Sequence, residues 1–124
     1  MANYVDLGKD IGQRLKNDGV KTSQIRKFLS AVNSVANKIQ NEGEQLNQAL
    51  ADEIQYLRVK LAYQAGREDI KRVQGDVSEY GLHYLQKVLD LAIGRIGNSK
   101  SEFEKFNKLV ETIVAYHKFY GGED

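Results

Sequence analysis

The fold is decided by residues 44–65, EQLNQALADEIQYLRVKLAYQA, because apolar side chains recur along this segment at spacings of three and four. That repeat places them on one face of an α-helix. The aligned residues are Leu46, Leu50, Ile54, Leu57 and Leu61. A helix with one apolar face has to bury it against other elements, so the rest of the chain must supply its partners.

The same helical repeat appears in four other long segments. We expect these helices at residues 4–16, 22–41, 76–96 and 99–120, with a short helical piece at 68–73. Glycines stand between most of the segments, the chain has no proline, and connections of a few residues favour antiparallel neighbours. We therefore predict an all-α fold in which residues 1–124 form a single domain, a compact bundle of about five helices that are mostly antiparallel.

Capping residues indicate where three of these helices begin. A serine, threonine or aspartate just before a helix can accept hydrogen bonds from the free N–H groups of its first turn. The candidates are Thr22 or Ser23 for the second helix and Asp76 or Ser78 for the fourth. For the fifth, Ser99 with Glu102 and Ser101 with Glu104 both fit a reciprocal capping pattern.

The composition excludes several classes of protein. With no cysteine, the chain can form neither disulfides nor thiolate metal sites, and it has no cysteine nucleophile. No stretch approaches the roughly 20 apolar residues that a membrane helix needs, and the N-terminus lacks the apolar centre of a signal peptide. We therefore expect a cytoplasmic protein with no membrane partner.

Catalytic and metal-binding patterns are not found in the sequence. The two histidines, His83 and His117, lack the spacing of a metal-binding pair, and the apolar surroundings of each favour a packed or boundary histidine. There is no nucleophile elbow and no glycine-rich phosphate loop. We predict no catalytic residue, no metal ligand and no cofactor, so the chain should act by binding. An enzyme would need a nuclease activity that depends on His117 or another named residue.

Basic and acidic residues are nearly balanced, 18 against 17, but they are sorted along the chain. Residues 14–27 and 58–72 are locally basic, and an acidic stretch at 42–53 separates them. A charged partner responds to this local sorting rather than to the net charge.

One basic stretch interleaves cations with aromatic rings. Tyr56, Lys60 and Tyr63 follow each other at spacings of four and three, which places them on one stripe beside the apolar face of the helix at 44–65. Arg67, four residues further on, continues the stripe if the helix extends past Gly66. Such a stripe suits nucleic acid, because cations neutralise phosphates while tyrosines contact sugars and bases without demanding a sequence. The alternative is an ordinary core boundary, with tyrosines at the edge and lysines covering the rim.

Two other predicted helices carry polar flanks of similar character, for which a simple solvated face is the alternative. These flanks are Lys27, Ser34, Lys38 and Asn41 on the second helix, and Lys105, Lys108, Thr112 and Tyr116 on the fifth.

Three strings of sequence, KTSQIRKF at 21–28, KLAYQAGR at 60–67 and AYHKFYGG at 115–122, go beyond composition. In their residues and in their order along the chain they resemble the small helical subunit of type III-A CRISPR-Cas interference complexes, the Csm effector. The resemblance spans nearly the whole chain, although residues 76–97 match no motif of that family.

The resemblance implies a non-catalytic subunit, present in more than one copy, that lines the inner filament of the complex. It would contact target RNA through sequence-independent backbone binding. The implied partners are the other Csm subunits, guide RNA and target RNA, and copies of the chain itself, with a possible homodimer in isolation. The alternative is a pure protein–protein assembly module of that complex with no direct role in RNA binding.

Two of the matching strings coincide with the basic stretches found independently. Adding the polar flanks gives a full set of expected RNA-binding residues. These are Arg26, Lys27, Lys38, Lys60, Tyr63, Arg67, Lys105 and Lys108.

Overall fold

The structure, a computed structural model, describes residues 3–69 and 73–124. Over these residues the chain forms five α-helices and one short 3-10 helix, which confirms the all-α prediction. Their bounds are α1 Tyr4–Asn17, α2 Thr22–Ile39, α3 Gln48–Gly66, η1 Val77–Glu79, α4 Gly81–Gly94 and α5 Lys100–Phe119.

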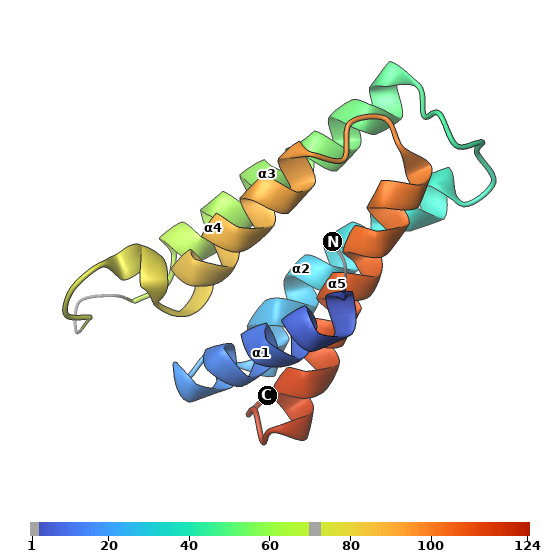
Figure 1. Ribbon diagram of the computed structural model, residues 1–124. Coiled ribbons are helices and arrows are strands. Elements are labelled where there is room, and N and C mark those ends of the chain that lie inside the picture. Colours follow the sequence, from blue (N-terminus) through green and yellow to red (C-terminus); the bar gives the residue numbers. More distant parts are fainter. Residues whose placement is uncertain (1–2, 70–72) are drawn as a thin grey trace.

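The helices pack as two groups that share one core. Figure 1 shows α3 and α4 side by side and running in opposite directions, while α5 lies with α1 and α2. The groups meet mainly where α2 packs against α3, with smaller contacts of α4 with α1 and α5. Apolar side chains from both form a single buried cluster, in which the ring of Phe28 on α2 meets that of Phe106 on α5 edge to face, with centroids 6.4 Å apart.

The apolar face predicted for residues 44–65 lies in this core. Ile54, Leu57 and Leu61 are buried on α3, as is Leu46 in the loop before it, whereas Leu50 is half-buried. Each fully buried leucine or isoleucine contributes about 1.5–3 kcal/mol relative to an exposed one. Burial of this face is therefore a main reason why α3 forms.

Two glycines allow α1 to approach α5 very closely. A methyl group at Gly12 would lie 2.8 Å from the backbone nitrogen of His117 and 2.9 Å from the carbonyl oxygen of Ile113. At Gly8, one turn earlier, it would lie 2.6 Å from Cγ2 of Thr112. The close α1–α5 contact is thus possible only because Gly8 and Gly12 have no side chain.

The start of α2 differs from the prediction. Lys21, and neither Thr22 nor Ser23, is the capping residue, and its N–H donates to the side-chain oxygen of Gln24 at 2.8 Å. The side chain of Thr22 is instead buried inside the first turn, next to His117. A threonine that is held by a tertiary contact is not available as a cap.

The third helix begins at Gln48, so the predicted start at Glu44 is wrong. Asn47 caps the helix by accepting from the N–H of Leu50 at 2.9 Å. The carboxylate of Glu44 binds the start of α5 instead, accepting from the hydroxyl of Ser99 at 2.6 Å and the N–H of Ser101 at 3.0 Å. Of the two serines predicted as caps for α5, Ser99 is the N-cap and Ser101 lies within the helix.

The fourth helix is shorter than the predicted 76–96. Asp76 caps η1 by accepting from the N–H of Ser78 at 3.0 Å, whereas α4 begins at Gly81. Of the short helical piece predicted at 68–73, residues 68–69 and 73 are not helical, and the remainder lies outside the described residues. Glu68 has another role, since its carboxylate accepts from the N–H of Leu82 at 2.8 Å in the first turn of α4.

Within residues 3–69 and 73–124, the structure contains no helix with the length and apolar character needed to cross a membrane.

Candidate nucleic-acid interface

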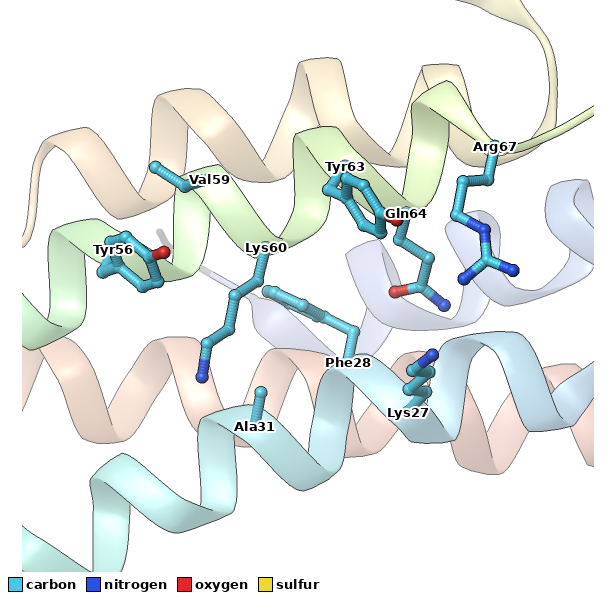
Figure 2. A pocket seen from close by; sticks show the side chains of 9 residues that line it. All are labelled: Lys27, Phe28, Ala31, Tyr56, Val59, Lys60, Tyr63, Gln64 and Arg67. Carbon is cyan, nitrogen blue, oxygen red and sulfur yellow. The ribbon is translucent and has the colours of Figure 1, made fainter.

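A groove runs between α2 and α3 on the surface of the molecule. Its central cavity has a volume of about 560 Å³, and Figure 2 shows the nine side chains that line it. Three come from α2 and the others from α3 and its C-terminal cap: Lys27, Phe28, Ala31, Tyr56, Val59, Lys60, Tyr63, Gln64 and Arg67.

The α3 wall carries the stripe predicted from the sequence. Tyr56 and Tyr63 are 57% and 69% exposed, so both rings face solvent. Each is paired with a cation one turn later, since Lys60 Nζ lies 6.0 Å from the ring centroid of Tyr56 and Arg67 Cζ lies 5.8 Å from that of Tyr63. Exposed pairs of this type contribute about 0.5–1 kcal/mol. The predicted interleaving of rings and cations is therefore confirmed as a geometric feature.

The α2 wall is apolar at its base and basic at its edge. Phe28 is almost fully buried beneath the groove, while Lys27 is exposed and approaches from the side opposite Arg67 (Figure 2). The side-chain amide of Gln64 donates to the backbone carbonyl of Gln24, which joins the two walls directly. The floor of the groove between the cations is thus formed by the apolar side chain of Phe28 and by the hydrogen bond from Gln64 to Gln24.

Two smaller hollows extend this cavity along the helices. One, of about 360 Å³, shares Lys27, Gln64 and Arg67 with the central cavity and continues to Ser23. The other, of about 350 Å³, shares Ala31, Tyr56 and Lys60 with it and continues past Lys38. The three spaces form one surface channel along α2, from Ser23 to Lys38, which we call the α2–α3 groove.

The charge of the α2–α3 groove is concentrated at its centre. Lys27, Lys60 and Arg67 make no ion pair with any carboxylate among the residues that the structure describes. At the far end, Lys38 binds Glu53 at 2.8 Å, and Asp52 lines the same hollow. Three cations without a carboxylate partner among the described residues therefore face the central cavity, and carboxylates line the hollow on either side of it, Glu68 in one and Asp52 with Glu53 in the other.

The structure divides the eight expected RNA-binding residues into two sets. Five line the α2–α3 groove: Lys27, Lys38, Lys60, Tyr63 and Arg67.

The other three lie elsewhere. Arg26 is 3.7 Å from Asp124 at the C-terminus, and Lys105 is 3.3 Å from Glu102 on its own helix. Lys108 lines two separate hollows of α5, one with α2 and one with the start of α1.

Sequence reasoning missed four residues of the central cavity that are neither charged nor tyrosine. Val59 is 53% exposed, which is unusual for a valine, and Gln64 forms the bridge to α2. The ring of Phe28 lies in the core and also lines the cavity together with Ala31. The sequence could have indicated only the two residues on α3, because Val59 and Gln64 are direct neighbours of Lys60 and Tyr63 in the stripe.

His117 has a structural environment, as the sequence predicts. Its side chain is fully buried, with Nε2 2.6 Å from the carbonyl oxygen of Val20 and Nδ1 3.0 Å from the hydroxyl of Thr22. The carbonyl can only accept, so Nε2 carries the proton and Nδ1 accepts from Thr22. Burial lowers the pKa of His117, which keeps the ring neutral.

The second histidine is held by the same carboxylate that caps α4. His83 is half-buried, and its Nδ1 lies 2.9 Å from Oε1 of Glu68. Over residues 3–69 and 73–124, no three His, Cys, Asp or Glu side chains come together in a way that could hold a metal ion.

Comparison with known proteins shows the family of the chain. A model of the Csm2 family of type III-A matches residues 1–123. A CRISPR system protein Csm2 from Streptococcus thermophilus is 32% identical over 127 residues, which cover 98% of this chain and 94% of that protein. Those from Enterococcus italicus and Mycobacterium tuberculosis are 35% and 30% identical, each over 83% of this chain and over 69% and 77% of their own lengths. The chain belongs to the Csm2 family of type III-A CRISPR systems.

Proposed function

We propose that this chain is a non-catalytic small subunit of the type III-A RNA-guided interference complex and that it binds target RNA in the α2–α3 groove. The observation that carries the RNA role is the set of three cations, Lys27, Lys60 and Arg67, that face one cavity and have no carboxylate partner in the part of the chain that the structure describes. Membership of the Csm2 family supports the place in the complex, with other Csm subunits as neighbours.

Binding of this kind reads the backbone and not the bases. Each cation that neutralises a phosphate releases a counterion, so the affinity falls with salt by about 0.7 logarithmic units per contact for a single strand. The three cations of the central cavity should therefore account for a slope of about two. Carboxylates line both outer hollows of the groove, Glu68 at one end and Asp52 with Glu53 at the other, so a strand is favoured at the central cavity between them.

The non-catalytic part of the proposal rests on the surroundings of the two histidines. His117 is buried and neutral, and His83 is hydrogen-bonded to a carboxylate that also caps a helix. General acid–base catalysis most often uses a histidine or a carboxylate within reach of the substrate. Among the described residues, those that line the central cavity include neither.

A second candidate is the assembly module, in which the same groove holds a neighbouring protein subunit. The exposure of Val59 favours it, because an apolar side chain beside tyrosines and arginine is typical of protein interfaces. A further exposed ring, Phe119 at 76%, lies outside the groove among Tyr116 and Tyr120, where it offers another surface for a protein partner.

The test replaces the three cations of the central cavity together, Lys27→Ala, Lys60→Ala and Arg67→Ala, in the assembled complex. A matched control removes the same charge outside the groove centre, through Arg26→Ala, Lys105→Ala and Lys108→Ala. Retention of target RNA is measured at several salt concentrations, and assembly without RNA is followed by size-exclusion chromatography. We expect the groove variant to assemble normally and to lose about two units of salt slope, with a smaller loss in the control.

Two results would contradict the RNA role. Equal loss of slope in both variants would show that only net charge matters. Dissociation of the groove variant in the absence of RNA would favour the assembly module.

A further inference from the structure

The α2–α3 groove contains more apolar and aromatic surface than phosphate binding requires. Cations alone suffice for phosphates, yet two exposed tyrosines and Val59 line the wall, and Phe28 lies below. The cavity of about 560 Å³ is within the range of small-molecule sites, roughly 300–1,000 Å³. The groove therefore has room and surface for a flat, apolar group beside the charged backbone.

The α3 wall repeats one unit twice. Tyr56 is followed four residues later by Lys60, and Tyr63 is followed four residues later by Arg67. In both units the cation lies about 6 Å from the ring centroid, at 6.0 Å and 5.8 Å. A ring followed by a cation, repeated after two helical turns, matches a polymer in which a flat base alternates with a charged phosphate.

From this repeat we propose that the α2–α3 groove binds unpaired RNA nucleotides, with one base stacked on Tyr56 and another on Tyr63 while Lys60 and Arg67 contact the adjoining phosphates. The inference rests on the proposed function, since it names the form of RNA that the groove takes. Stacking on a tyrosine tolerates any base, because every base has a π-face. Binding at this site would thus not depend on the RNA sequence, but it would depend on the presence of bases.

The spacing of the rings explains why the bases should be unpaired. Seven residues separate Tyr56 and Tyr63, which is about 10.5 Å along a helix. A regularly stacked strand rises about 3.4 Å per nucleotide and covers the faces of its bases with their neighbours. Two rings that are this far apart can each reach a base face only where the strand is unstacked.

A protein segment is the competing occupant, and the repeat argues against it. An acidic peptide could satisfy the cations, and its apolar side chains could cover Val59. However, nothing in a peptide backbone alternates charge and flat ring with the period of the two units. The experiment below separates the two occupants.

The test compares two labelled probes of equal length, oligouridine and an oligomer with the same ribose-phosphate backbone but no bases. Both are titrated against the full chain by fluorescence anisotropy. The variant is Tyr56→Leu with Tyr63→Leu, which keeps apolar volume and removes the flat rings. Phe119→Leu, at an exposed ring outside the groove, is the matched control.

We expect the unmodified chain and the Phe119→Leu control to bind oligouridine at least tenfold more tightly than the abasic strand. That factor corresponds to about 1.4 kcal/mol, at the lower end of the value for one stacked base. The double tyrosine variant should lose the difference, by weakening oligouridine binding and leaving abasic binding unchanged.

The other outcomes overturn the inference in distinguishable ways. Equal affinity of the unmodified chain for both probes, with a normal salt slope, would reject base stacking and leave the proposed function intact. Failure of both probes to bind would reject RNA binding itself. In that case, loss of a co-purifying subunit from the double tyrosine variant would identify a protein occupant.

Discussion

Replacing Gly12 with alanine should destabilise the protein, because α1 and α5 touch at this position. The added methyl group would lie 2.8 Å from the backbone nitrogen of His117 and 2.9 Å from the carbonyl oxygen of Ile113, where ordinary contact begins at 3.4 Å. Both atoms belong to the backbone of α5, so no side chain can rotate away. The two helices would have to separate by roughly half an ångström.

The expected cost follows from these contacts. Overpacking of a core by one methyl group costs about 1–3 kcal/mol, and alanine in place of glycine within a helix recovers about 0.5–1 kcal/mol. Taking the middle of each range, the net loss in the free energy of unfolding is about 1.3 kcal/mol. With an unfolding entropy of about 2.1 cal/mol/K per residue, a chain of 124 residues loses about 4 °C of Tm per kcal/mol, or about 5 °C in total.

Thermal unfolding followed by circular dichroism measures this shift, and Gly66→Ala is the matched control. Gly66 is the last residue of α3, and a methyl group there would meet nothing within 4 Å. The control should therefore keep or raise Tm by up to about 4 °C. A Gly12→Ala variant with a Tm equal to or above that of the unmodified chain would refute the account of the α1–α5 contact.

Two further predictions concern stability. Because burial lowers the pKa of His117, the unfolded chain takes up a proton near pH 6.5 before the folded one does, so stability should fall as the pH drops from 7.5 to 5.5. His117→Gln, which can still donate to the carbonyl of Val20, should show a smaller fall of the urea unfolding midpoint over this pH range. An equal fall in the variant and the unmodified chain would show that His117 is not the group responsible. Asn47→Ala removes the hydrogen bond to the N–H of Leu50 and should cost about 1 kcal/mol in urea unfolding; an unchanged midpoint would show that Asn47 is not an effective cap.

Periodicity was sufficient to predict α3 and its exposed stripe, because both depend on residues within a single helix. The error at its start has a local cause. Leu46 continues the apolar repeat and is buried as expected, but its N–H donates to the carbonyl of Asn98 and the segment is a loop. A helix and a docked loop can bury the same leucine, and only the tertiary contact distinguishes them.

The second wall of the groove could not be predicted in the same way. The buried face of α2 is covered by α5 on one side and by α3 on the other, so it has two polar edges that look alike in the sequence. Arg26 and Lys27 are neighbours in the chain, yet Arg26 reaches Asp124 while Lys27 lines the groove. Which edge meets Tyr63 and Arg67 is set by helix packing.

The two walls of the α2–α3 groove belong to different packing groups, since α2 lies with α1 and α5 whereas α3 lies with α4 (Figure 1). An occupant of the groove would therefore contact both groups and restrict their relative motion, in addition to the hydrogen bond from Gln64 to Gln24. Amide hydrogen exchange in α3 and α4 should slow when the groove is filled, and a neighbour that pulls on this helical pair would change the width of the channel.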